Sequence, residues 1–89
     1  MKVLLVTYDL KQSKESYTNL YAALKTAPYW WHYIESTWLL ATEQSPKDWY
    51  AKLAPTIFNT DRLLIIEVAP NYWGWLSNDA WDWIKKNLG

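Results

Sequence analysis

The chain has 89 residues and equal numbers of acidic and basic side chains, nine of each, so its formal net charge is zero. This excludes a global electrostatic attraction to nucleic acid or to an anionic membrane, and any such binding must use a local patch. Hydrophobic residues make up 51% of the chain, with eight Trp and seven Tyr, which argues against intrinsic disorder. One domain is expected over 1–89, with a core at 1–69 and a Trp-rich extension at 70–89.

Several classes of protein are excluded by composition. There is no Cys, so disulfides and thiolate zinc sites are impossible, and a reducing, cytoplasmic location is expected. The apolar run after Lys2 is too short for a signal peptide, and no segment reaches transmembrane length, so no membrane association is expected. Gly74 and Gly89 are the only glycines, which excludes the glycine-rich phosphate loops of nucleotide-binding enzymes.

The first expected element is a strand at 2–8, whose residues Val3 to Val6 are apolar on both faces. A helix follows, which Ser13 can cap and Pro28 closes. The i, i+3, i+4, i+7 spacing of its apolar stripe comes from Tyr17, Leu20, Tyr21 and Leu24.

The stretch YWWHYIESTWLLAT is dense in aromatic and β-branched residues, which favour strands. It predicts strands at 30–35 and 37–42 joined near Ser36. A short helix then begins with Ser45 as N-cap and Pro46 in its first position, and Pro55 limits it.

RLLIIEVA at 62–69 predicts the last strand. The chain ends in a helix with acidic residues early and basic residues late, as the helix dipole prefers. These residues are Asp79, Asp82, Lys85 and Lys86.

The order of elements is β, α, β, β, α, β, α, and its first six match the split βαβ arrangement. We therefore expect an α+β fold, a ferredoxin-like βαββαβ sandwich with an added C-terminal helix. Two helices cover one face of such a sheet, yet the first and last strands are apolar on both faces. Either the Trp-rich tail or the same face of a second copy must cover the open side.

Asp9 stands where the first apolar strand stops, and two interpretations are open. An Asp after a strand can bind the backbone N–H two residues on, in an Asx turn. Alternatively, Asp9 and its symmetry mate in a homodimer hold a divalent metal, Mg²⁺ or Mn²⁺, since a pair of carboxylates is chemically sufficient while one alone is poor.

Four stretches of the sequence, YDL, WWHYIESTWLL, DRLLIIEV and the WGWL and AWDWIKK tail, are spread along the chain from residue 8 to residue 86. With them the chain resembles the SinR-like proteins, which are similar to the small CRISPR-associated ferredoxin-like proteins of the spacer-acquisition complex and to VapD-type ribonuclease toxins. Where those CRISPR-associated proteins carry arginines after the aspartate, this chain has KQSK.

The resemblance implies a homodimer and metal-dependent cleavage of RNA or DNA, with Asp9 as the catalytic, metal-binding residue. It places Tyr8 and Ser36 beside that site as supporting residues. Lys11 and Lys14 are the candidates for binding nucleic acid, although short charge runs are usually solvated surface. The alternative function is a non-catalytic dimeric scaffold that binds nucleic acid, or a protein partner through the Trp-rich tail.

His32 is the only histidine, so no two-histidine metal site exists within one chain. It is expected either to pack on the strand surface on the same face as Trp30, or to transfer protons. Glu35 is expected on the opposite face, away from Asp9 unless the turn bends it there. The tryptophans are expected to fill the core and an interface, with base stacking as the alternative.

Overall fold

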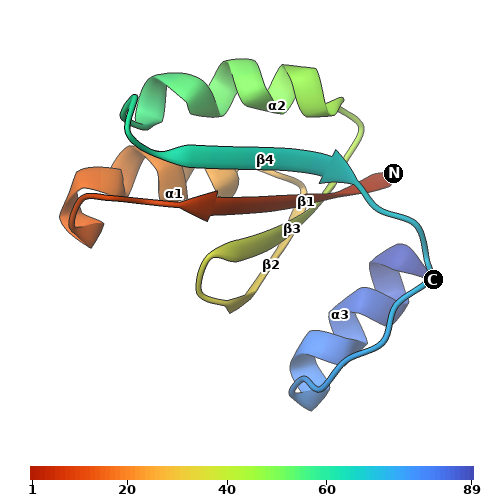
Figure 1. Ribbon diagram of the computed structural model, residues 1–89. Helices are drawn as coiled ribbons and strands as arrows, with labels where there is room; N and C mark the ends of the chain where they lie inside the picture. Colours follow the sequence, from red (N-terminus) through yellow and green to blue (C-terminus); the bar gives the residue numbers. More distant parts are fainter.

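The computed structural model describes all 89 residues as an α+β fold. Four antiparallel strands form one sheet in the order β2-β3-β1-β4. The strands are β1 (Lys2–Asp9), β2 (Tyr29–Ile34), β3 (Thr37–Thr42) and β4 (Arg62–Glu67). The helices are α1 (Thr18–Leu24), α2 (Pro46–Leu53) and α3 (Asn78–Leu88), with short 3₁₀ turns η1 (Lys14–Tyr17) and η2 (Ala54–Thr56). Helices α1 and α2 lie on one face of the sheet and α3 on the other (Figure 1).

The predicted strands are all present, with small changes at their ends. β1 extends through Asp9, so this carboxylate belongs to the strand itself and pairs across the sheet with Arg62. β3 has the predicted bounds, whereas β4 ends at Glu67, before the predicted 69. None of the helices is both long enough and apolar enough to cross a membrane.

The helix ends show which capping predictions were correct. At α2, the Asp48 backbone N–H donates to the Ser45 hydroxyl, and the Ser45 N–H donates back to the Asp48 carboxylate, both at 3.1 Å. Ser13 lies at the N-cap of η1, but its side chain makes no capping hydrogen bond. The predicted first helix therefore begins as a 3₁₀ turn before it becomes α1. Gly89 ends α3 with a φ of 91°, which glycine adopts without steric cost.

The main core lies between the sheet and the pair α1 and α2. Alternate residues of β1 and β3 point to this face because successive side chains of a strand alternate. Ten buried residues form the cluster: Leu4, Val6, Tyr17, Leu20, Leu24, Ala27, Trp38, Leu40, Trp49 and Leu53. The predicted stripe of the first helix supplies Tyr17, Leu20 and Leu24, while Tyr21 is only partly buried.

The second face carries a smaller core beneath α3. Six buried residues form it: Val3, Trp31, Leu39, Ala41, Ala80 and Ile84. Trp31 fixes the helix to the sheet, because its indole N–H donates to the Ala80 carbonyl at 3.2 Å. The sequence left two possibilities for what covers this face, the C-terminal tail or a second copy of the chain. The tail covers the part of the face formed by β2, β3 and β1.

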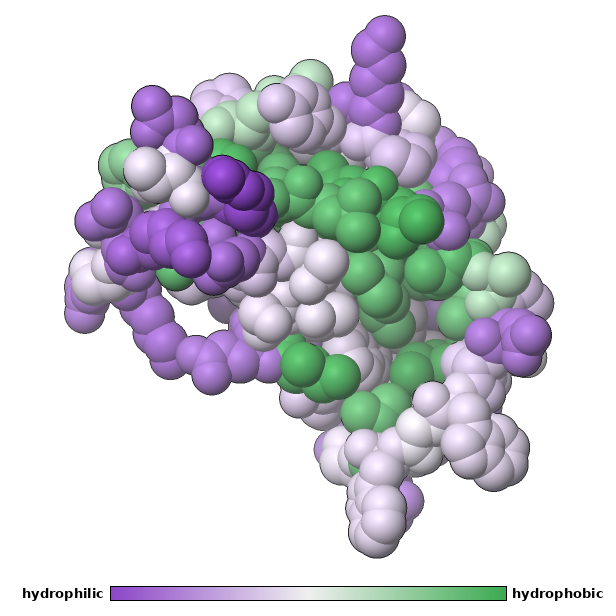
Figure 2. Space-filling view, viewed as in Figure 1, coloured by the Kyte–Doolittle hydropathy of each residue, from purple (hydrophilic) through white to green (hydrophobic).

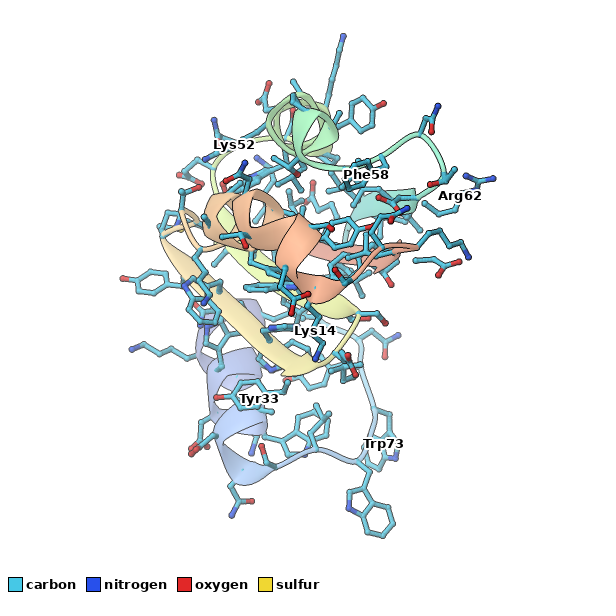
Figure 3. The ribbon with its side chains drawn as sticks, turned by 90° about the vertical axis from the view of Figure 1, so that its left-hand side faces the viewer. Lys14, Tyr33, Lys52, Phe58, Arg62 and Trp73 are labelled. Carbon is cyan, nitrogen blue, oxygen red and sulfur yellow. The ribbon has the colours of Figure 1, made fainter.

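The β4 part of the second face stays uncovered. Leu64 and Ile66 are 55% and 50% exposed, and the space-filling view shows an apolar patch on this side of the molecule (Figure 2). Beyond β4, Trp73 and Trp75 are almost fully exposed. The view with side chains shows Trp73 at the opposite end of the molecule from Lys52 and α2 (Figure 3).

Asp61 joins two regions that are distant in sequence, residues 11–17 and residues 58–61. Its buried carboxylate accepts hydrogen bonds from the Lys11 backbone N–H at 2.8 Å, from the Tyr17 hydroxyl at 2.8 Å and from the Phe58 backbone N–H at 2.9 Å. The loop after β1, the start of the first helical segment and the approach to β4 are therefore tied to one group.

These contacts change the acidity of Asp61. Burial alone raises the pKa of a carboxyl, but the hydrogen bonds from Phe58, Lys11 and Tyr17 stabilise the charged form and together hold the pKa of Asp61 below its ordinary value. A group with a lowered pKa stabilises the fold at neutral pH, and this stabilisation is lost as the pH falls below the ordinary value and through the lowered one.

We expect Asp61→Asn to lower the free energy of unfolding by roughly 1–3 kcal/mol at neutral pH, because the amide cannot accept all three hydrogen bonds. The difference between wild type and variant should shrink as the pH falls below the ordinary carboxyl pKa of 3.8. Urea unfolding at a series of pH values measures both quantities.

Asp82→Asn is the matched control, because Asp82 is exposed on α3 and makes no hydrogen bond or ion pair with its side chain. Its stability should follow wild type at every pH. Equal stability of wild type and Asp61→Asn at neutral pH would contradict the role given to Asp61.

Candidate functional site

A cavity of about 860 Å³ opens between the first helical segment, the end of β1 and the turn that joins β2 to β3. Four of the five residues predicted for the site line it, namely Tyr8, Asp9, Lys14 and Ser36. Lys11, the fifth, is not part of its lining. Aromatic and cationic side chains that the sequence did not assign to a site also line it, and those used below are Tyr21, Lys25, His32 and Trp38.

The floor of the cavity is a fixed chain of hydrogen bonds. The Trp38 indole N–H donates to the Tyr8 hydroxyl at 2.9 Å, and this hydroxyl donates to the Glu35 backbone carbonyl at 3.1 Å. Burial is the main cause that raises the pKa of Tyr8, against the hydrogen bond from Trp38, which lowers it. The phenol therefore stays protonated at neutral pH and acts as a structural donor.

His32 covers the indole of Trp38. The two rings are nearly parallel, with 3.9 Å between their centroids and 14° between their planes. The Nε2 atom of His32 lies 2.8 Å from the Glu35 carbonyl oxygen. A carbonyl can only accept, so Nε2 carries the proton in the neutral ring, and Nδ1 is left as an acceptor without a partner in the chain. The expectation that His32 packs on the strand surface beside Trp30 is confirmed, since both rings contact Trp38.

Glu35 lies elsewhere than predicted. Strict alternation along β2 placed it on the face opposite His32, but the pairing of β2 with β3 shifts register between Trp31 and Ile34. This irregularity breaks the alternation and turns the Glu35 residue into the same cavity that Asp9 and His32 line. A bulge depends on the partner strand, so the sequence of β2 alone gave no signal for it.

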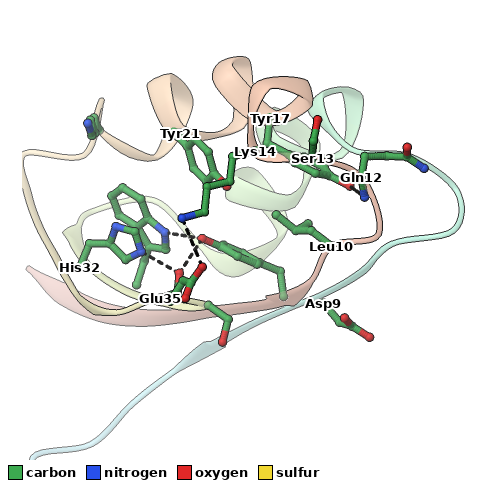
Figure 4. A pocket seen from close by; sticks show the side chains of 13 residues that line it. Asp9, Leu10, Gln12, Ser13, Lys14, Tyr17, Tyr21, His32 and Glu35 are labelled. Carbon is green, nitrogen blue, oxygen red and sulfur yellow. Dashed lines mark hydrogen bonds and ion pairs between the residues drawn. The ribbon is translucent and has the colours of Figure 1, made fainter.

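Two lysines stand at the mouth of the cavity. Lys14 Nζ lies 3.5 Å from the Glu35 carboxylate, and the side chains are 79% and 83% exposed. Lys25 Nζ lies 5.4 Å from the centre of the Trp30 ring, in a cation–π contact. Figure 4 shows Lys14 reaching down toward Glu35 above the aromatic floor.

Asp9 is at the edge of this arrangement, and its carboxylate points away from the Glu35 cluster (Figure 4). Its only ion pair is with Lys11 Nζ at 2.8 Å, and its side chain is 64% exposed. The Asx turn offered as one interpretation is wrong, because Asp61 already accepts the Lys11 backbone N–H. Asp9 is thus a solvent-exposed carboxylate that makes no hydrogen bond to the backbone.

No group of three or more His, Cys, Asp or Glu side chains converges. Tyr8 was expected to support a metal at Asp9, but its hydroxyl is occupied by Trp38 and Glu35. A divalent cation at Asp9 would need further oxygen ligands from a second chain or from a substrate.

The chain matches no protein-family model, no curated protein and no solved structure. The function proposed below therefore rests on the geometry of the cavity.

Proposed function

We propose that this protein is a ferredoxin-like, homodimeric module that binds nucleic acid, RNA or DNA, at the mouth of the cavity. The strand order β2-β3-β1-β4 supports the ferredoxin-like class, because a split βαβ fold whose two helices share one face has this order. The proposal places the protein in the cytoplasm, which suits a chain without cysteine.

The observation that carries this function is the pair Lys14 and Lys25 above aromatic walls. An exposed ion pair such as Lys14 with Glu35 contributes only about 0.2–1 kcal/mol. Lys14 can therefore exchange Glu35 for a phosphate at little cost. Lys11 lies just outside the cavity and adds a third cation near the end of β1, although it must first leave Asp9. The carboxylates of Asp9 and Glu35 balance the two lysines of the lining, so phosphate binding depends on lysines that exchange a carboxylate partner for a phosphate.

We expect the double variant Lys14→Ala/Lys25→Ala to weaken binding of a labelled single strand, and to reduce the slope of log K against log salt by roughly 0.7 for each lysine that contacts a phosphate. Fluorescence anisotropy over a salt series measures both. The control is Lys85→Ala/Lys86→Ala, which removes the same charge from α3.

The control should bind like wild type, apart from a small general effect of charge. Equal losses in the two double variants would mean that net charge and not the cavity mouth determines binding, and would overturn the assignment of the site.

Cleavage of the bound strand is the second candidate function, and the solvated carboxylate of Asp9 favours it. Asp9 lines the same cavity as Lys14 and is free of structural hydrogen bonds to the backbone. Two Asp9 side chains related by a dimer axis would hold Mg²⁺ or Mn²⁺. The metal would activate water or stabilise the leaving oxygen of a phosphodiester.

For this candidate we expect wild type to cut labelled RNA or DNA with Mg²⁺ or Mn²⁺ and to lose the activity in chelator, and we expect Asp9→Asn to be inactive under all conditions. Gel analysis of the products checks this, with Asp82→Asn as the control. Binding without metal-dependent cleavage by wild type would leave the non-catalytic scaffold as the function.

The homodimer is supported by apolar surface that the chain leaves open. Trp73 and Trp75 are 99% and 98% exposed, and each indole offers roughly 150–250 Å² of surface. A standard interface buries about 800 Å² per partner, so the two indoles supply about half of it. Leu64 and Ile66 add to this surface, and β4 is an edge strand with unpaired backbone groups. A second copy of the chain is the occupant that we propose.

We expect the wild-type protein to sediment as a dimer, and Leu64→Lys/Ile66→Lys to sediment as a folded monomer, because the charges cannot be buried. Analytical ultracentrifugation with circular dichroism checks mass and folding. The control is Tyr50→Lys, a substitution at an exposed position of α2, and this variant should stay dimeric. A monomeric wild type would overturn the dimer and the shared Asp9 site, and would leave the Trp-rich tail for a different protein partner.

A further inference from the structure

We infer that the cavity takes one unpaired nucleobase, which stacks on the ring surface formed by His32 and Tyr21 while its phosphate reaches Lys14 and Lys25. This inference rests on the proposed function and narrows its ligand to a base that is free of a duplex. The ligand chemistry is a flat aromatic ring joined to a phosphate, which a single strand and a free nucleotide share.

Two aromatic side chains of the cavity, His32 and Tyr21, lie nearly parallel to the ring of Trp38. Trp38 is only 1% exposed and acts as a rigid support. His32 lies parallel to it, and Tyr21 lies at 6.5 Å between ring centroids with only 18° between the planes. His32 and Tyr21 are partly exposed, so their rings are accessible to a ligand. A base stacks on such rings whatever its identity, because every base has a π-face.

The hydrogen bonds of the floor are already complete. Every buried side-chain nitrogen and oxygen in the chain has a partner, and the Glu35 carbonyl is shared by Tyr8 and His32. No buried group of the floor needs a hydrogen bond from the ligand. The cavity therefore does not select one base by leaving a buried group unpaired when another base binds.

Size and charge agree with the same ligand. A volume of about 860 Å³ lies within the range of small-molecule sites. The cations stand at the mouth and the rings inside, which is the order of phosphate and base along a nucleotide. A paired base cannot enter, because its faces are stacked and its edge is bonded to the other strand, and its extraction costs a few kcal/mol.

The test compares a strand with bases and a strand without bases at equal phosphate charge, with a duplex and a free nucleotide as two further probes. The probes are a labelled oligodeoxythymidylate, an abasic strand of the same length, a duplex of that length and free thymidine monophosphate. We expect wild type to bind the thymidylate strand roughly fivefold or more tightly than the abasic strand, since stacking on aromatic side chains strengthens binding in this range. The duplex should bind no better than the abasic strand.

Variants of His32 locate the effect. His32→Ala should abolish most of the preference for the strand with bases, whereas His32→Phe should keep it because a ring still covers Trp38. Circular dichroism and thermal unfolding of both variants confirm that they fold. His32 lies outside the main core cluster, but its ring covers Trp38 of that core, so the unfolding data are needed to separate a loss of stacking from a loss of the core.

The outcomes separate this inference from the proposed function. If strands with and without bases bind equally and both depend on Lys14 and Lys25, the base site is wrong while nucleic-acid binding stands. If no probe binds, both are wrong. Free thymidine monophosphate that binds as tightly as the strand, with the same loss in His32→Ala, supports the base site and assigns it to a free nucleotide.

Discussion

The buried carboxylate of Asp61 joins parts of the chain that the rest of the structure depends on. Its hydrogen bonds to Lys11, Tyr17 and Phe58 fix where β1 ends, where the first helical segment begins and how β4 enters the sheet. A charge in this position is tolerated because donors surround it, and each donor would be costly to leave unpaired. Asp61 therefore sets the position of the cavity wall that contains Lys14.

The opposite wall of the cavity depends on a second network with a different character. Here Trp38, Tyr8 and His32 converge on the backbone of Glu35. The network fixes the tautomer of His32 and the plane of its ring, and it leaves the carboxylate of Glu35 in solvent beside Lys14. Stacked aromatic rings and an exposed lysine in a weak ion pair thus lie together, which is the combination that the proposed nucleobase site needs.

The two apolar faces of the sheet are covered by helices to different extents. α1 and α2 cover one face except where the cavity opens, whereas α3 covers the other face only over β2, β3 and β1. The β4 side and the extended segment before α3 keep large apolar side chains in solvent, with Trp73 and Trp75 as the extreme case. Exposed apolar surface of this extent often marks an interaction site. None of these exposed residues lines the cavity, so the surface proposed for the homodimer is separate from the site proposed for nucleic acid.

The sequence by itself determined the elements and their order, because strand alternation, helical spacing and caps such as Ser45 are local properties. The family resemblance named Tyr8, Asp9, Lys14 and Ser36 as candidates for one site, and all four line the cavity. The sequence did not determine the partners of these residues. Tertiary structure decided three of these contacts. The register shift in β2 changed the position of Glu35, Asp61 accepted the hydrogen bond from the Lys11 N–H, and α3 packed on Trp31. Each depends on contacts between segments far apart in the chain, which no local pattern encodes.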